Sequence, residues 1–276
     1  MMNIFDFTKK KQAGDKITMV TCYDYTSAVL VNGSDVDCIL VGDSLAMTMH
    51  GFPSTVAATV DMMAMHTAAV ARGAKDKFIV ADLPFLAYRG DLAQNIAAVQ
   101  AVMQAGAHAV KIEGAAGNTD FVRHLTESGV PVMGHIGLTP QFVHLLGGYR
   151  VQGKTEESAN RLKEEAIALE QAGAFSLVME CVPTVLAQEI TASLRIATIG
   201  IGAGAGTDGQ VLVFQDLLGL NTDFRPKFVK NFMDGAGLVT AALNEYNNAV
   251  KTGAFPDAKH SFNADGANAG RVAQPA

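Results

Sequence analysis

The sequence has few of the features that mark secreted, membrane-spanning or nucleic-acid-binding proteins. Its 276 residues contain no tryptophan and three cysteines, Cys22, Cys38 and Cys181. The cysteine spacing matches neither a disulfide framework nor a zinc site, so we expect free thiols in a reducing cytosol. No apolar run approaches the ~20 residues that cross a bilayer. Residues 1–16 are charged and lack the apolar core of a signal peptide. These absences predict a soluble, cytoplasmic protein with no membrane partner.

Basic residues are also too few to form a nucleic-acid-binding face. The chain has 21 Lys and Arg against 27 Asp and Glu, a formal net charge of −6, and its basic residues are scattered. Apolar residues make up 49% of the chain, enough for one large core. We therefore expect a single catalytic domain over residues 1–262. Residues 263–276 are mostly Ala, Gly, Asn and Pro, which predicts a disordered tail.

Five short apolar segments each end in a polar residue. Their composition is typical of buried strands. The polar residues that follow them are, in chain order, Asp43, Asp82, Glu113, His135 and Glu180. Because a charge is costly inside a core, we expect these side chains just past the strand ends, each with a partner.

A helix–glycine–strand–acid unit occurs twice, which indicates repeated βα units. Gln104-Ala-Gly-Ala107 leads to Glu113 and Gln171-Ala-Gly-Ala174 leads to Glu180, with seven positions from glycine to acid in both. Eight strands are predicted, at 17–22, 36–41, 77–81, 109–112, 131–135, 174–180, 197–201 and 211–214. The predicted fold is α/β, best closed as a (β/α)8 TIM barrel with a short N-terminal helix at residues 3–12. An open doubly wound sheet is the alternative, but polar residues end many strands rather than one switch point.

In such a barrel the site is built from the C-terminal strand ends. That rule gathers seven residues around one mouth: Asp43, Ser44, Asp82, Lys111, Glu113, His135 and Glu180. Lys111 and Glu113 are two apart on one strand, so their side chains point to the same face. Crowded carboxylates repel one another unless a cation joins them. Without cysteines or a histidine pair they suit a hard ion, so Mg²⁺ is the predicted metal and zinc is not.

Each candidate also has a purely structural explanation. An Asp at a strand end is often a helix N-cap. Lys111 and Glu113 could form an ordinary salt-bridge layer, and His135 could be a hydrogen-bonded turn residue. Glu180 closes an apolar strand and is a candidate general base. The glycines at 200–206 could hold a phosphate, but no lysine or helix start follows, so close packing or a tight turn is favoured.

The motifs, taken together and in order, resemble those of the ketopantoate hydroxymethyltransferase family over about residues 3–262. The matching segments are Gly42-Asp-Ser-Leu45, Ala81-Asp-Leu-Pro-Phe85, Lys111-Ile-Glu-Gly114, Gly134-His-Ile-Gly-Leu-Thr-Pro-Gln141, Gly147-Gly-Tyr-Arg-Val-Gln-Gly153, Glu180-Cys-Val-Pro183, Gly200-Ile-Gly-Ala-Gly204 and Asp208-Gly-Gln210. The resemblance implies a (β/α)8 barrel that assembles as a homodecamer. It also implies transfer of a hydroxymethyl group from 5,10-methylenetetrahydrofolate to the keto acid 3-methyl-2-oxobutanoate. The product would be ketopantoate, in the first step of pantothenate and coenzyme A biosynthesis.

The same likeness implies roles for individual residues. The substrate-binding residues that it implies are Asp43, Ser44, Asp82, Lys111 and His135. Asp43 and Asp82 would hold Mg²⁺, with Glu113 at or just beyond the metal shell, and Glu180 would be the base. This chemistry is consistent with the residues, because a Lewis acid on the keto oxygen is needed to stabilise an enolate. The enolate carbon attacks the one-carbon unit, so no protein nucleophile is required.

Two other functions remain as alternatives. A C–C lyase or mutase of the isocitrate-lyase and phosphoenolpyruvate-mutase type has a similar barrel, but those lyases need a reactive cysteine in a loop motif that we do not find here. The other alternative is a non-catalytic, ring-forming, metabolite-binding barrel. The retention of every charged strand-end residue argues against it.

Overall fold

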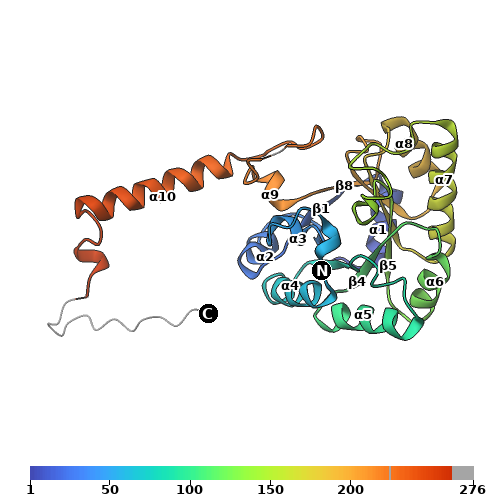
Figure 1. The fold of residues 1–276 in the computed structure, drawn as a ribbon, viewed down its shortest axis with the longest axis horizontal. Helices are drawn as coiled ribbons and strands as arrows, with labels where there is room; N and C mark the ends of the chain where they lie inside the picture. Colours follow the sequence, from blue (N-terminus) through green and yellow to red (C-terminus); the bar gives the residue numbers. More distant parts are fainter. Residues whose placement is uncertain (224, 263–276) are drawn as a thin grey trace.

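The computed structural model describes residues 1–223 and 225–262, and in it eight parallel strands close into a barrel in chain order (Figure 1). The strands are β1 Ile17–Thr21, β2 Cys38–Val41, β3 Phe78–Asp82, β4 Ala109–Glu113, β5 Val132–Gly137, β6 Ser176–Glu180, β7 Ala197–Ile201 and β8 Gly209–Leu212. Most strand residues are buried, because side chains fill the interior and helices cover the outside. The predicted (β/α)8 barrel is confirmed.

Helices follow most strands and form the outer layer. They are α1 Ile4–Ala13, α2 Tyr25–Asn32, α3 Leu45–Thr48, α4 Val60–Gly73, α5 Leu92–Gln104, α6 Thr119–Glu127, α7 Glu156–Gln171, α8 Thr184–Ser193, α9 Phe214–Leu217 and α10 Gly235–Thr252, with short 3₁₀ turns at Thr55–Ala57, Pro140–Phe142 and Ala258–His260. Side-chain caps start several of them; Asp91 accepts from the Gln94 N–H at the start of α5. Within the described residues, no helix is both long and apolar enough to span a membrane.

Helix α1 covers the end of the barrel at which the strands begin, as we predicted for the amphipathic segment 3–12. Phe7 is fully buried and packs edge-on against Phe78 and Phe175, which lie where β3 and β6 begin. A salt bridge between Lys11 and Asp208, with an N–O distance of 2.8 Å, ties α1 to the start of β8. The N-terminal strand ends are therefore covered, which leaves the C-terminal ends as the open mouth.

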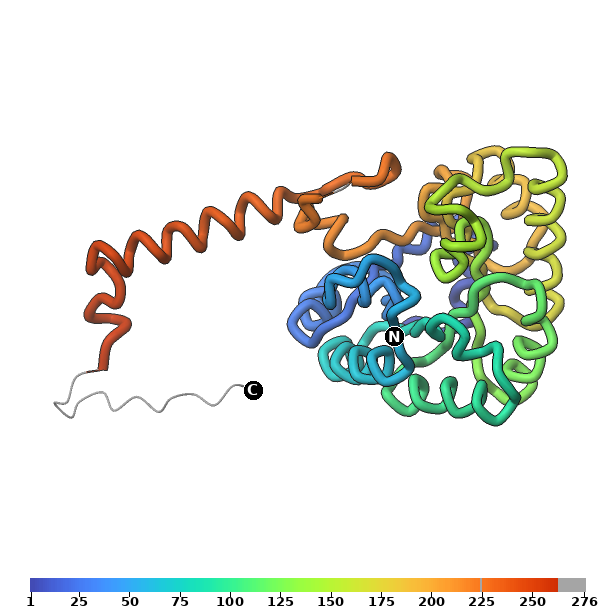
Figure 2. The backbone as a smooth tube through the Cα atoms, viewed as in Figure 1, coloured from blue at the N-terminus to red at the C-terminus, as the bar shows by residue number. Residues whose placement is uncertain are grey.

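Several strand bounds differ from the sequence prediction by two residues, as at β2, β5 and β6, and two differences have a structural consequence. Strand β8 begins at Gly209 rather than at residue 211, because its register is set by pairing with β1. A Cβ at Gly209 would lie 2.4 Å from the Ile17 carbonyl oxygen, so only glycine permits this approach. Helix α10 was not predicted, and it extends away from the barrel (Figure 2). The tail predicted at 263–276 lies outside the described residues.

Candidate functional site

Inward-facing rows of the strands change from apolar to charged as they approach the mouth. Phe78 and Val80 belong to the interior core of the barrel, and the next inward residue of β3 is Asp82. On β4, Ala109 is followed by Lys111 and Glu113 in the same alternation. On β5, Met133 is followed by His135 in the same alternation, and β6 ends in Glu180. The barrel interior is therefore apolar where the strands begin and polar near their C-terminal ends.

The strand register sets which charged residues become neighbours. Asp82 on β3 is aligned with Lys111 on β4, and Glu113 is aligned with His135 on β5. The Lys111 Nζ lies 3.1 Å from Asp82 Oδ1 and 3.7 Å from Glu113 Oε1. Burial alone would lower the Lys111 pKa, but the negative charges of Asp82, Glu113 and Asp43 outweigh it and hold that pKa above its ordinary value. Lys111 is thus a buried cation among carboxylates.

Glu113 is held as a carboxylate by partners on both of its oxygens. His135 Nδ1 lies 3.2 Å from Oε1, and the Gln141 backbone N–H donates to Oε2 at 3.0 Å. Burial would raise the Glu113 pKa, but the His135 hydrogen bond and charge, with Lys111 and Gln141, bring it below its usual value. Because both oxygens are engaged by the protein, Glu113 fits a place just beyond a metal shell better than one inside it.

His135 connects this cluster to the rim of the mouth. Burial and Lys111 lower its pKa, but the hydrogen bond and charge of Glu113, together with Glu180, outweigh them and raise it. The His135 Nε2 lies 3.4 Å from Glu180 Oε2 and makes no hydrogen bond within the described part of the chain. The Glu180 side chain is 17% exposed, against 2–3% for the four other charged groups that contact one another here. Glu180 is therefore the acid that solvent and ligands can reach.

Asp43 and Asp82 form a buried pair whose negative charge is not fully balanced by the positive groups around it. Asp82 Oδ2 accepts the Asp43 backbone N–H at 3.0 Å, while the buried Asp82 Oδ1 has no aligned hydrogen-bond donor among the described residues. Burial raises the pKa of both carboxyls, and the charges of Asp82 and Glu113 raise that of Asp43 further. Neither side chain caps a helix in the described chain, so the structural explanation of these aspartates does not apply.

A divalent cation suits this pair. Mg²⁺ is bound through one or two carboxylates, with water and ligand oxygens completing its shell. Asp82 Oδ1, which has an ion pair with Lys111 but no aligned hydrogen-bond donor in the described chain, and the excess negative charge are consistent with such an ion. Over residues 1–223 and 225–262, no three His, Cys, Asp or Glu side chains converge as a ready ligand set. The structure thus brings Asp43 and Asp82 together, but it does not add Glu113 as a third converging ligand.

Ser44 lies beside the aspartate pair and is oriented by a residue that the sequence analysis did not select. Its Oγ is 2.8 Å from the Tyr23 hydroxyl, and burial raises the Tyr23 pKa to about 12, so the phenol stays neutral. A Cβ at Gly42 would lie 2.8 Å from Ser44 Oγ and 3.6 Å from Asp82 Oδ2. The glycine therefore leaves room for both groups at the end of β2.

Two further buried residues at the mouth were also missed, Gln141 and Tyr88. Gln141 follows β5 and contacts Asp43 and Glu113, and the Tyr88 hydroxyl donates to Gln141 Oε1 at 2.7 Å. The one sequence signal for Gln141 was its place at the end of the 134–141 motif. Neither residue has a charge or a diagnostic spacing, so no pattern of residue types in the sequence indicated a role for it.

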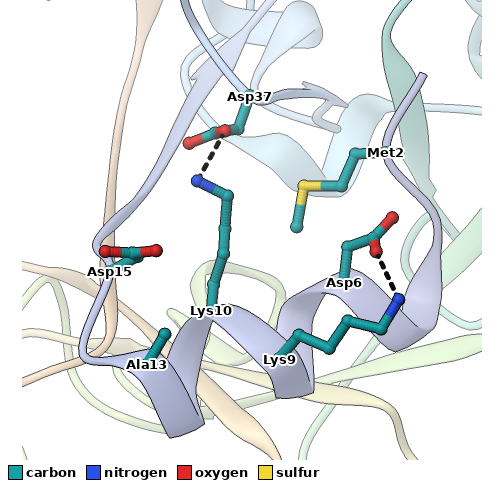
Figure 3. A pocket seen from close by; sticks show the side chains of 7 residues that line it. All are labelled: Met2, Asp6, Lys9, Lys10, Ala13, Asp15 and Asp37. Carbon is teal, nitrogen blue, oxygen red and sulfur yellow. Dashed lines mark hydrogen bonds and ion pairs between the residues drawn. The ribbon is translucent and has the colours of Figure 1, made fainter.

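Other candidate features lie outside this cluster. The glycines at 200–206 are closely packed, as favoured, because a Cβ at Gly204 would lie 2.4 Å from Thr184. The three cysteines are free thiols. A cavity of about 360 Å³ lies at α1, at the opposite end of the barrel from the mouth (Figure 3). Lys9 pairs with Asp6 and Lys10 with Asp37, so neither lysine of this cavity is left free to bind an anion.

The barrel architecture with ionisable groups at the C-terminal strand ends is that of the TIM-barrel enzymes. The sequence profile of ketopantoate hydroxymethyltransferase matches residues 1–258. A 3-methyl-2-oxobutanoate hydroxymethyltransferase from Bdellovibrio bacteriovorus is 58% identical over 262 residues, covering 95% of this chain and 100% of that protein. One from Francisella tularensis subsp. tularensis is 55% identical, covering 95% and 99%. The chain therefore belongs to the ketopantoate hydroxymethyltransferase family of enzymes.

More distant solved structures share the fold. A 2,3-dimethylmalate lyase, described as a member of the PEP mutase/isocitrate lyase superfamily, superposes with a TM-score of 0.58 at 16% identity, covering 96% of this chain and 93% of that one. At this identity the likeness concerns the barrel alone. It does not distinguish the transferase from the lyase alternative.

Proposed function

We propose that the protein transfers a hydroxymethyl group from 5,10-methylenetetrahydrofolate to 3-methyl-2-oxobutanoate and so forms ketopantoate, the first step of pantothenate and coenzyme A biosynthesis. Family membership supports the reaction class. The observation that carries the mechanism is the buried Asp43–Asp82 pair, which lies next to Lys111, in the same polar layer as the more accessible Glu180. This arrangement suits a small anionic keto acid bound together with Mg²⁺.

Asp43 and Asp82 would hold the ion, and Glu113 would stand at or just beyond its shell. Bound Mg²⁺ supplies Lewis-acid stabilisation of the negative charge that develops on a keto oxygen. Asp82 Oδ1 is the ligand atom that we expect on β3, because its 3.1 Å contact with Lys111 Nζ is an ion pair and not an aligned hydrogen bond. The deep burial of both aspartates excludes bulk water, which strengthens their interaction with a cation.

Lys111 and Ser44 would bind the carboxylate of the substrate. Lys111 keeps its positive charge because three acids surround it, so it can balance a further negative charge close to the ion. The Ser44 hydroxyl is oriented by its 2.8 Å contact with Tyr23 and adds a neutral donor. Together they would fix the keto acid with its C3 carbon toward the open side of the mouth.

Glu180 would accept the C3 proton as the general base. His135 Nε2, 3.4 Å from Glu180 Oε2, would donate to that oxygen and leave Oε1 to take the proton. On the other side of the ring, His135 Nδ1 lies 3.1 Å from Lys111 Nζ and 3.2 Å from Glu113 Oε1, which holds the ring with Nε2 toward Glu180. The deprotonated carbon of the substrate attacks the one-carbon unit itself, so the protein needs to supply no nucleophile.

We also propose that the protein works as a cytoplasmic homo-oligomer, with the decamer of the family as the expected state. Helix α10 supports assembly, since only Gly235 of its 18 residues is buried. Its exposed apolar side chains are Leu238, Val239, Leu243, Tyr246 and Val250. An apolar surface of this kind marks a protein interface. Light scattering after size exclusion tests this, and a monomer would contradict it.

The direct test of the activity is to incubate the protein with 3-methyl-2-oxobutanoate, Mg²⁺ and 5,10-methylenetetrahydrofolate and to detect ketopantoate by mass spectrometry. We expect product only when all three are present. Absence of ketopantoate together with cleavage of isocitrate-like acids would favour the lyase alternative. Keto-acid binding with neither product would favour a non-catalytic barrel.

A further inference from the structure

Gln141 connects three neighbouring strand ends at the mouth. It lies in the 3₁₀ turn directly after β5 and is 2% exposed. Its side-chain Nε2 donates to Asp43 Oδ2 at 2.8 Å and to the Leu83 carbonyl oxygen at 2.9 Å. Its backbone N–H donates to Glu113 Oε2 at 3.0 Å. One residue from the turn after β5 thus contacts residues at the ends of β2, β3 and β4.

The orientation of the Gln141 amide is fixed by its surroundings. The Leu83 carbonyl and the Asp43 carboxylate are acceptors, so the NH₂ group must face them. The Tyr88 hydroxyl donates to Oε1 at 2.7 Å, on the other side of the amide. Both amide hydrogens and the amide oxygen are therefore used, and the side chain cannot rotate without breaking buried hydrogen bonds.

This contact determines which oxygen of Asp43 is available. Oδ2 accepts the Gln141 donor, and no hydrogen bond to Oδ1 is found within the described residues, so Oδ1 is the oxygen that we expect to face a cation. A neutral donor suits this place, since it orients Asp43 without adding a positive charge that would compete with a cation. Ligating carboxylates are commonly held in this way by a hydrogen-bond partner outside the metal shell.

We propose that Gln141 is a positioning residue, which aims Asp43 at the divalent cation through its Nε2–Oδ2 hydrogen bond and sets the strength of cation binding. The proposal rests on the proposed function, because it takes Asp43 as a metal ligand. It assigns Gln141 no contact with substrate.

The experiment compares Mn²⁺ binding, followed by the electron paramagnetic resonance signal of the free ion, in wild type, Gln141→Met and Gln141→Asn. Methionine keeps the length without a donor, and asparagine keeps the amide but is one methylene too short. We expect both to raise the dissociation constant for Mn²⁺ by about 10- to 100-fold. The exposed Gln104 on α5 provides the matched control, and Gln104→Met should bind Mn²⁺ as wild type does.

Tyr88→Phe separates the donor from general packing, because it removes the bond on the oxygen side of the amide and a 3.4 Å contact with the Glu113 carbonyl but leaves the Nε2 donor in place. Its Mn²⁺ affinity should stay closer to wild type than that of Gln141→Met. Equal losses in these two variants, or a Gln141→Met dissociation constant within about twofold of wild type, would overturn the proposal. If neither Gln141 variant folds, the proposal is also overturned, because the residue would then be needed for folding and not for orienting Asp43.

The two proposals can fail separately. If wild type binds Mn²⁺ but forms no ketopantoate, the proposed function is wrong while the binding comparison still decides the role of Gln141. If wild type forms ketopantoate and Gln141→Met binds Mn²⁺ normally, only the positioning role is wrong.

Discussion

Lys111 is the group whose removal most directly tests the electrostatics of the mouth. Its ammonium lies 3.1 Å from Asp82 and 3.7 Å from Glu113, and its side chain is 3% exposed. Lys111→Met keeps most of the side-chain volume and removes the charge. Asp43, Asp82 and Glu113 would then share the buried layer with only His135 to balance them.

Breaking a buried ion pair by removing one partner destabilises a protein by about 3–5 kcal/mol. We expect a loss of this size in the free energy of unfolding near pH 8, measured by chemical denaturation with a chelator present. The sign of the pH dependence follows from the raised pKa of Asp43 and Asp82. A carboxyl with a raised pKa in the folded state contributes stability at low pH and loses it as pH rises through that pKa. The deficit should therefore be smaller at about pH 5 than near pH 8, because lowering the pH favours the protonated form of these carboxyls.

An exposed ion pair offers the matched control. Lys163 lies 2.7 Å from Glu189 on the surface, and its side chain is 38% exposed. Lys163→Met should cost less than about 1 kcal/mol at either pH, because solvent screens such a pair. If Lys111→Met cost no more than Lys163→Met near pH 8, the claim that the acids of the mouth depend on a buried cation would be refuted.

Three further predictions concern the reaction and the ion. Glu180→Gln should abolish solvent exchange of the substrate C3 proton, followed by NMR in D₂O, while keto-acid binding is retained; exchange at the wild-type rate would remove Glu180 as the base. Asp82→Ala should raise the Mg²⁺ concentration needed for half-maximal activity by at least about tenfold, and an unchanged metal titration would place Asp82 outside the shell. Without metal, wild type should lose stability as pH rises above the ordinary Asp range, because the Asp43 pKa is raised, and saturating Mg²⁺ should remove that loss; equal slopes with and without Mg²⁺ would contradict the cation site.

The sequence could predict the barrel because its signals are local. Apolar strand segments, helix caps such as Asp91 and the repeated glycine-to-acid spacing each depend on residues close together in the chain. Local patterns also predicted that the charged side chains meet at one mouth, since all parallel strands end on the same side. The alternation on β4 was enough to place Lys111 and Glu113 on one face.

Contacts between distant segments could not be predicted in this way. Gln141 lies 98 positions from Asp43, and Tyr23 lies 21 positions from Ser44. Neither pair has a pattern that marks it, because amide and hydroxyl side chains are common and their partners depend on how the barrel closes. The unpredicted helix α10 is a further case, since its apolar face has no counterpart in the described chain to reveal its role.

By itself, the sequence determined the order of the elements, the closed parallel fold and the set of acids that end the strands, because short-range periodicity encodes all three. Only the tertiary structure decided how those acids are used. The strand register aligned Lys111 with Asp82 and His135 with Glu113. It thereby placed the Lys111 ammonium against Asp82 and left Glu180 more exposed than the other charged groups that it joins. The physical reason is that pKa and hydrogen bonding depend on distances across the barrel, which closure sets and local sequence does not.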